Sequence, residues 1–286
     1  MTLGKPGYHR RKIGDAIITA IFDGRVDVAL DNILGIDPAE SARLQREALR
    51  SEPPALDTSF FVIERDDDVF LVDTGGNKAL DAGLGHGKDN LQAAGIDRER
   101  VTHVLLTHLH SDHYGGLLDD DGNAAFPNAT LLPPALDRTF RLYPPDYDDM
   151  PADTRNMIDR IRRYVAPYRA NIRFITEGEV LPGINAIPLP GHTPGHTGYS
   201  LSSGDEKIIF YGDVIHFPAV QFRHPGSSMS YDVDPKQAAT SRQALFEQVS
   251  ADGTMVAGAH MNFPCFGHVM RDTGVAFRWV AASFLP

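Results

Sequence analysis

Cysteine is nearly absent from this sequence, in which Cys265 stands alone among 286 residues. A single cysteine excludes an intrachain disulfide framework. Because Cys265 lies between Pro264 and Phe266, we expect a small buried apolar side chain there, and neither a metal ligand nor a nucleophile. Long apolar runs are missing as well, since none reaches the ~18 consecutive apolar residues of a transmembrane helix. The sequence therefore predicts no membrane partner.

Positive charge is scarce relative to negative charge: 27 lysines and arginines stand against 38 aspartates and glutamates, which gives a net charge of -11. Proteins that bind nucleic acids need clustered basic side chains to contact phosphates, so no nucleic-acid partner is expected. Residues 1–12 are basic, but no apolar stretch follows them. This pattern argues against a secretory signal and predicts a cytoplasmic protein. The acidic runs Asp66–Asp68 and Asp119–Asp121 are typical of solvated turns.

The composition is that of a globular enzyme, with a hydrophobic fraction of 42% and a charged fraction of 23%. A length of 286 residues favours one α/β domain over residues 1–286, with a helical insertion at about 134–170. Two predicted helices open with an Asp-Pro pair, which offers an N-cap followed by a first-turn proline. The predicted elements are strands at 17–22, 59–64 and 69–73, and helices at 37–49, 153–164 and 234–249.

One loop concentrates metal-ligating side chains, namely Thr107–His113, directly after a strand-like stretch that ends at Leu106. It holds three histidines and one aspartate. Imidazole and carboxylate ligands suit zinc and neighbouring transition metals, and so many donors favour two ions held close together. His192, Asp213 and His260 each follow another short strand-like stretch. The sequence therefore predicts a metal site assembled from several strand ends.

This pattern resembles the metallo-β-lactamase superfamily, in which an H-x-H-x-D-H loop is followed by a later His, Asp and His. The resemblance runs from the Asp73–Gly76 turn to the last of these histidines. It implies the fold class, an α/β (α+β) four-layer αβ/βα sandwich of two mixed sheets flanked by helices, with the metals at one edge. The ligands that it implies are His108, His110 and His192 for one ion, Asp112, His113 and His260 for the other, and Asp213 as a bridge.

Two such ions would share a water whose pKa falls from ~16 towards ~7, which makes hydroxide available as a nucleophile at neutral pH. We therefore expect a metal-dependent hydrolase in which Asp112 and Asp213 have catalytic roles. The ligand types favour zinc, while cobalt, manganese and iron also accept them. The rival interpretations are a di-iron redox enzyme, which in this fold usually carries a fused flavin domain, and a pseudoenzyme, which the complete ligand set disfavours.

Stretches outside the ligands, Ala20–Asp27 and Gly258–His268, resemble the methyl parathion hydrolase and quorum-quenching lactonase group. This resemblance favours a lactonase acting on acyl-homoserine or other lactones, with an organophosphate phosphotriesterase as the alternative. Either substrate would be a small, neutral, apolar molecule. Many relatives dimerise, so a homodimer is a further expectation. The candidate pocket residues, chosen because they lie near the ends of the motifs, are Phe22, Phe217, Phe222 and Phe263.

His216 marks a departure from the acyl-homoserine lactonases, which place a tyrosine three residues after the bridging aspartate. An imidazole at this position could donate a hydrogen bond or act as a general acid near neutral pH, or it could orient a ligand. His196 is expected to fix its loop by hydrogen bonding. Asp73 is expected to orient a metal-ligating histidine or its loop.

Overall fold

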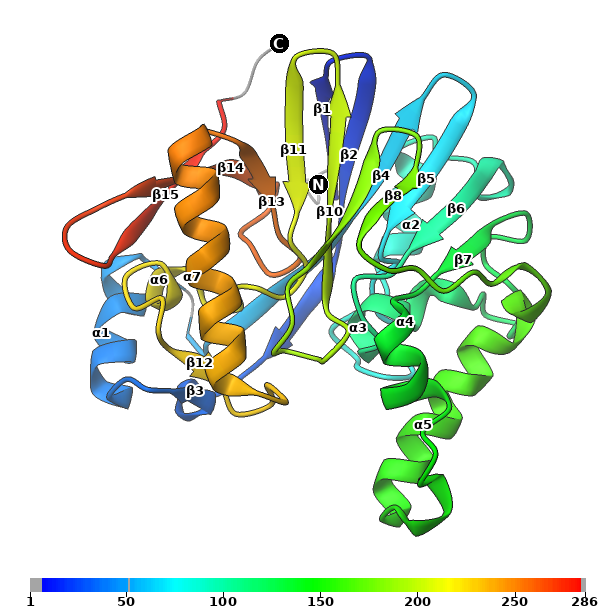
Figure 1. The fold of residues 1–286 in the computed structure, drawn as a ribbon, viewed down its shortest axis with the longest axis horizontal. Coiled ribbons are helices and arrows are strands. Elements are labelled where there is room, and N and C mark those ends of the chain that lie inside the picture. Colours follow the sequence, from blue (N-terminus) through cyan, green and yellow to red (C-terminus); the bar gives the residue numbers. More distant parts are fainter. Residues whose placement is uncertain (1–6, 51, 284–286) are drawn as a thin grey trace, which may run out of the picture.

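Two mixed β-sheets pack face to face, and helices cover their outer faces (Figure 1). This computed structural model describes residues 7–50 and 52–283, so the first half of the basic N-terminal stretch lies outside the described residues. The predicted αβ/βα sandwich is confirmed. Within the first sheet β5, β6 and β7 run parallel, as do β11 and β13 in the second, while the remaining neighbours are antiparallel.

The elements have the following bounds. The first sheet consists, in spatial order, of β1 (Tyr8–Ile13), β2 (Ala16–Asp27), β4 (Ala55–Arg65), β5 (Asp68–Val72), β6 (Val101–Leu105) and β7 (Thr130–Leu132). The second consists of β15 (Phe277–Ala281), β14 (Phe266–Arg271), β13 (Met255–Ala257), β11 (Glu206–Phe210), β10 (Thr197–Ser203), β9 (Ile184–Pro188) and β8 (Gly178–Leu181). A small ladder joins β3 (Ile33–Leu34) to β12 (Ser228–Met229). The α-helices are α1 (Pro38–Glu47), α2 (Gly87–Ala93), α3 (Ser111–Tyr114), α4 (Ala135–Asp137), α5 (Ala152–Val165), α6 (Pro218–Gln221) and α7 (Pro235–Asp252). Shorter 3-10 or π-helical turns are Leu30–Asn32, Arg98–Arg100, Gly115–Leu117, Arg138–Leu142, Tyr147–Asp149 and Ala166–Asn171.

Strand β4 shows why the sandwich has layers on both sides of each sheet. Its side chains alternate between faces, and both faces are buried. Phe61 and Ile63 belong to the core between the two sheets, whereas Phe60 and Val62 belong to a second core beneath α2 and α5. An uninterrupted apolar strand is what such two-sided burial requires.

The helix caps that the Asp-Pro pairs predict are present. The Asp37 carboxylate accepts a hydrogen bond from the backbone N–H of Ala39 at 2.8 Å, and α1 begins at Pro38. The Asp234 carboxylate accepts one from Gln237 at 2.9 Å, and α7 begins at Pro235. Each cap satisfies a backbone donor that the first helical turn leaves free.

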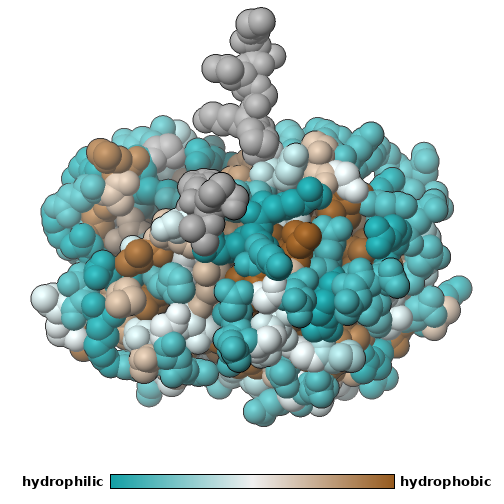
Figure 2. Space-filling view, turned by 90° about the horizontal axis from the view of Figure 1, so that it is seen from above, coloured by the Kyte–Doolittle hydropathy of each residue, from teal (hydrophilic) through white to brown (hydrophobic). Residues whose placement is uncertain are grey.

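The two ends of the sandwich differ in character. One end carries the tight hairpin turns, including the predicted acidic turn between β4 and β5. At this turn Arg65 and Asp68 lie opposite each other in the antiparallel ladder. Figure 2 views this end and shows a largely hydrophilic surface with scattered apolar residues. The other end carries the longer loops that follow β5, β6, β9, β11 and β13. Among the described residues no helix is both long and apolar enough to cross a membrane, and Cys265 is buried, as predicted.

Candidate metal centre

The loops at the second end bring together all seven side chains that the sequence marks as candidate ligands. Parallel β5 and β6 end side by side, and β11 and β13 end beside each other in the facing sheet. The donor atoms form two groups, and within each group they lie within 4.8 Å of one another. Asp213 belongs to both groups. The groups are His108, His110, His192 and Asp213, and Asp112, His113, Asp213 and His260.

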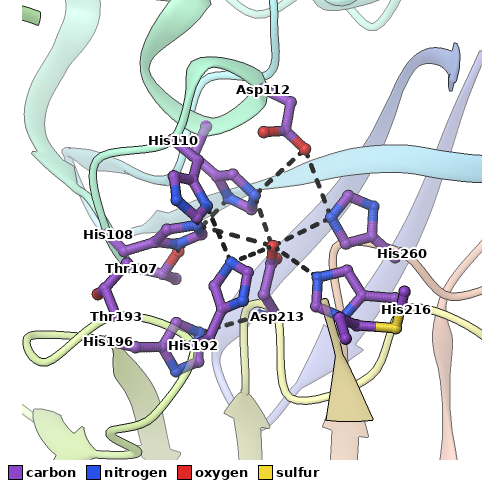
Figure 3. Close-up of polar contacts among 12 residues, drawn as sticks. Thr107, His108, His110, Asp112, His192, Thr193, His196, Asp213, His216 and His260 are labelled. Atoms are coloured by element: carbon purple, nitrogen blue, oxygen red, sulfur yellow. Dashed lines mark hydrogen bonds and ion pairs between the residues drawn. The ribbon is translucent and has the colours of Figure 1, made fainter. Parts of the chain in front are cut away.

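Three imidazoles define the first group (Figure 3). His110 Nδ1 lies 2.8 Å from His108 Nε2 and 2.9 Å from His192 Nε2. The carboxylate of Asp213 closes the group, with Oδ2 3.3 Å from His192 Nε2. Three nitrogens and one oxygen converging on one point make a donor set that suits tetrahedral zinc.

The second group is richer in oxygen. Asp213 Oδ1 lies 3.1 Å from His113 Nε2, and its Oδ2 lies 3.2 Å from His260 Nε2. Asp112 Oδ2 completes the group at 3.4 Å from His260 Nε2 and 3.5 Å from His113 Nε2. Asp112 is the least enclosed of these residues, since its side chain is 23% exposed whereas that of Asp213 is 3% exposed. It therefore faces the surrounding space while Asp213 sits within the cluster.

Outer hydrogen bonds fix which nitrogen of each ring points inward. His113 Nδ1 donates to Asp73 Oδ2 at 2.9 Å, and His192 Nδ1 donates to Asp232 Oδ1 at 2.8 Å. His260 Nδ1 donates to the backbone carbonyl of Asp57 at 2.9 Å. A neutral imidazole with its proton on Nδ1 has a lone pair on Nε2. Burial acts to lower the pKa of these three rings, but the neighbouring carboxylates raise it, so the rings favour protonation when no cation is bound. In its neutral form each ring presents a lone pair to the cluster, as metal-binding histidines do.

Unpaired buried atoms test whether the cluster fits metal ions. His113 Nε2 and Asp213 Oδ1 are buried and have no hydrogen-bond partner among the described residues. Leaving such acceptors unpaired is costly, and facing lone pairs repel one another. A cation placed among them removes both penalties. The donor set therefore fits two divalent ions.

The outer contact of His110 differs from those of His113, His192 and His260, because its partner, Arg141, is a donor and not an acceptor. Its Nη2 lies 3.0 Å from His110 Nε2, and a guanidinium can only donate. If His110 Nδ1 held an ion, the ring proton would lie on Nε2, and this nitrogen and the guanidinium would then both be donors.

The electrostatics of the cluster keep Asp213 ionised. Burial acts to raise the pKa of Asp213, but the imidazoles of His113 and His260 hold it well below its usual range.

Burial and the neighbouring His192 lower the pKa of His196 to about 3. The neutral His196 ring donates from Nδ1 to the Leu189 carbonyl at 2.8 Å and accepts the backbone N–H of Asp213 at Nε2, 3.0 Å away. The loop-fixing role predicted for His196 is confirmed.

Asp73 also has the predicted orienting role. Besides its bond to His113, it accepts the backbone N–H of Thr107 at 2.8 Å and the Thr107 hydroxyl at 2.9 Å. The backbone at Asp73 has a φ of 62°, a left-handed conformation that aspartate tolerates better than most residues. Asp73 thus fixes both the start of the histidine loop and one of its rings.

Asp137 performs a comparable task that sequence reasoning missed. It lies at the end of α4, in the helical segment far along the chain from either loop. Its carboxylate accepts the backbone N–H of Leu109 at 3.0 Å, the backbone N–H of Gly195 at 3.1 Å and the Thr193 hydroxyl at 3.1 Å. One buried carboxylate therefore connects the loop that carries His110 to the loop that follows His192. No local motif signals this residue.

A cavity of about 410 Å³ opens onto the cluster. Its wall includes Val26 at the end of β2, Val28 just after that strand, Leu56 at the start of β4, and Tyr231. Tyr231 was not selected from the sequence, yet its ring lies 5.2 Å from that of His216 and 6.0 Å from that of His192. Burial raises the pKa of Tyr231, so its hydroxyl stays protonated and can donate.

The four phenylalanines selected from the sequence do not line this cavity. Phe217 and Phe222 are buried in hydrophobic cores, and Phe222 stacks on Phe246 with ring centroids 5.1 Å apart. Phe22 and Phe263 contact each other edge to face at 5.8 Å. Closeness to a motif in sequence does not determine which way a side chain points, because neighbouring side chains alternate between faces. Aliphatic side chains at the strand ends form the apolar wall instead.

His216 packs inside the cluster. Its Nε2 lies 3.2 Å from Asp213 Oδ2, and its ring stacks on His260 with centroids 5.1 Å apart. Burial lowers the pKa of His216 to about 4, so the ring is neutral at neutral pH. A neutral ring beside a carboxylate donates from Nε2. In this structure His216 therefore contacts the shared ligand.

Comparison with known proteins bears on the family and the fold of this chain. A family model described as the metallo-beta-lactamase superfamily matches residues 53–260. The crystal structure of AbOPH, a hydrolase in the beta lactamase superfamily, has 30% sequence identity and a TM-score of 0.93, covering 99% of each chain. The structure of AidC, a dizinc quorum-quenching lactonase in complex with a product, has 24% identity and a TM-score of 0.89, covering 98% of this chain and 99% of that one.

Curated relatives match over shorter stretches. The N-acyl homoserine lactonase of Bacillus thuringiensis is 23% identical over 172 residues, which cover 59% of this chain and 60% of that one. The chain spans about half the length of the first curated relatives that it matches. The match to whole solved structures is therefore more complete than the match to these relatives.

Proposed function

This chain belongs to the metallo-beta-lactamase superfamily and is a metal-dependent hydrolase, and from that premise we propose that it opens lactones. Phosphotriester hydrolysis is the second candidate. The observation that carries the proposal is the cavity of about 410 Å³, because its apolar wall ends at the convergent donors. Cavities of roughly 300–1,000 Å³ with few polar groups are typical of sites for small organic molecules.

The two donor groups would hold two divalent ions, for which we propose zinc. When bound, such ions lower the pKa of a water molecule and polarise the bond that is broken. The chain's own residues supply the positioning. Asp213 joins the two groups, Asp112 reaches both the cluster and the cavity, and Asp73, Asp137 and Asp232 fix the rings and loops that present the donors.

The relatives favour the lactone over the phosphotriester. AidC is described as a quorum-quenching lactonase, and the Bacillus thuringiensis relative is an N-acyl homoserine lactonase. AbOPH is described only as a hydrolase. A lactone also suits this cavity, since a cyclic ester places its carbonyl at the donors while an acyl chain occupies the aliphatic wall of Val26, Val28 and Leu56.

Purified protein with a measured metal content should be tested side by side on acyl-homoserine lactones, an aromatic lactone and a dimethyl nitrophenyl phosphotriester. We expect kcat/KM to be higher on the best lactone by a factor of about 100, equivalent to ~2.7 kcal/mol of differential transition-state stabilisation. The reverse ranking would make the phosphotriester the main substrate. Turnover of none of these compounds by protein with both ions bound would refute both candidates.

The structure makes a specific prediction for His216, which was selected from the sequence as a catalytic residue. Because it donates to Asp213 Oδ2, we expect it to act through that ligand. His216→Ala should lower kcat/KM by about 10–100-fold on the lactone and on the nitrophenyl phosphotriester alike, and it should weaken metal binding. Steady-state kinetics and metal titration on the same preparation would measure both effects.

Tyr231→Phe is the matched variant, since it removes one hydroxyl from the same side of the cavity. The Tyr231 hydroxyl stays protonated, and no described residue accepts a hydrogen bond from it. It can therefore donate a proton or a hydrogen bond to a poor leaving group in the cavity. We expect a loss on the lactone of about tenfold, little loss on nitrophenolate release, and unchanged metal binding. A lactone-selective loss in His216→Ala instead would assign the acid role to His216.

A further inference from the structure

The cavity beside the cluster has a second kind of wall, supplied by helices. Tyr114 comes from α3, and Met157 and Arg160 come from α5. Helix α5 packs against α3, so the helical segment brings a basic side chain to the cavity. The aliphatic wall from β2 and β4 carries no comparable charge.

The carboxylates that line the cavity already have partners. Asp112 contacts His113 and His260 at 3.5 Å and 3.4 Å, and Asp213 lies within the histidine cluster. Asp81 is turned back to its own loop, where it accepts the backbone N–H of Gly83 at 2.8 Å. None of these carboxylates forms an ion pair with Arg160.

Arg160 differs from the other arginines of α5. Arg155 donates to the Met150 carbonyl, Arg162 pairs with Asp159 at 3.1 Å, and Arg163 lies over the Tyr164 ring at 5.5 Å. Within the described part of the chain, Arg160 has no hydrogen-bond or ion-pair partner, and it is exposed. A cavity residue with five free N–H donors in a planar fork is suited to bind a carboxylate in two places at once.

A second cation lies behind the same wall. Arg141 donates from Nη1 towards Met157 Sδ at 2.8 Å, and its Nε is buried without a partner among the described residues. Two guanidinium groups therefore lie on the helical side of the cavity, although the whole chain has a net charge of -11.

We propose that Arg160 determines specificity by binding an anionic group, a carboxylate, on the acyl side of the substrate. The preferred substrates are then esters or lactones whose acyl chain ends in a carboxylate. The inference rests on the proposed hydrolysis of lactones or related esters, and it makes the acyl chain of the substrate anionic instead of neutral. The aliphatic side chains of Val26, Val28 and Leu56 contact the methylene part of such a chain, and Arg160 contacts its charged end.

A matched pair of esters tests this. Mono-para-nitrophenyl glutarate and its methyl ester share the leaving group and the chain length and differ in one negative charge. We expect the wild-type protein, with both ions bound, to favour the carboxylate ester in kcat/KM by about tenfold. In Arg160→Gln the ratio should fall to about one, while Arg160→Lys should retain part of it.

Arg163→Gln is the control, because it removes the same charge from the same helix at a residue that does not line the cavity. It should keep the wild-type ratio, which separates a local contact from a general change in potential. Retention of the preference in Arg160→Gln would overturn the proposal, as would a wild-type protein that prefers the methyl ester.

The anilides of the same two acids, which a weak esterase does not cleave, separate this proposal from the hydrolase proposal. Calorimetry should show that the wild-type protein binds the carboxylate anilide about tenfold more tightly than its methyl ester, and that Arg160→Gln loses this difference. If neither nitrophenyl ester is turned over, the hydrolase proposal fails for these esters, and the anilides still decide the role of Arg160. Equal anilide binding by wild-type protein and Arg160→Gln would remove that role.

Discussion

Replacing Asp213 with alanine should abolish turnover and release bound metal. Its Oδ1 lies 3.1 Å from His113 Nε2, and its Oδ2 lies 3.3 Å from His192 Nε2, so one carboxylate serves both donor groups. Without it, two sets of neutral imidazoles would have to hold two dications with only Asp112 as a counter-charge. We expect kcat/KM to fall by at least about 1,000-fold, equivalent to ~4 kcal/mol of transition-state stabilisation.

Metal content by mass spectrometry and kcat/KM should be measured on the same preparation. Asp205→Ala is the control, because Asp205 is an exposed aspartate in the hairpin that precedes β11. It should retain both metal and activity. An Asp213→Ala protein that is fully metallated and active would show that Asp213 is not a ligand shared by the two donor groups. Each group would then bind its ion without this carboxylate.

The fold and the candidate ligands could be predicted because their signals are local. His108, His110 and His113 lie within one short loop, and each cap of α1 and α7 is set by an adjacent Asp-Pro pair. Loops that end parallel strands of one sheet meet at the same edge. Histidines in loops that directly follow strands are therefore expected to converge, and this expectation needs only the order of residues along the chain.

The residues around the ligands could not be predicted in this way. Asp137 reaches both histidine loops from α4, and Asp232 reaches His192 from the segment after β12. Both contacts depend on how distant elements pack, and neither residue stands in a recognisable motif. The same holds for Tyr231 and Arg160, which reach the cavity because of the paths of the segment before α7 and of α5.

The four phenylalanines were selected from the sequence as pocket residues but do not line the cavity. Phe217 and Phe222 are the kind of residue that lines an apolar pocket, but they are also the kind that fills a core. Burial of a whole aromatic side chain contributes roughly 1.5–3 kcal/mol, so the core takes most of them. Both are at most 3% exposed. Aromatic character alone therefore does not identify the wall of a cavity.

Replacing Arg242 with methionine should destabilise the fold more than any surface substitution. The guanidinium is buried at 1% exposure within α7. It donates to the carbonyls of Val214 at 2.6 Å, Pro225 at 3.0 Å and Ser227. Methionine fills much of the same space but leaves these buried carbonyls without a donor. Each loss costs about 1–3 kcal/mol, so the three losses together should lower the free energy of unfolding by about 3–9 kcal/mol.

Urea denaturation of the metal-free protein would measure this change, with Gln243→Met as the control because Gln243 is the next residue of α7 and is exposed. The control should change stability by less than about 0.5 kcal/mol. Val214 directly follows Asp213, and Ser227 begins the segment that leads to Asp232, so the same variant should also weaken metal binding. If Arg242→Met were as stable as the control, the three carbonyls would have found other donors and the loop after Asp213 would be held by something other than α7. If instead stability fell while metal affinity stayed at the wild-type value, Arg242 would support the core without positioning the shared ligand.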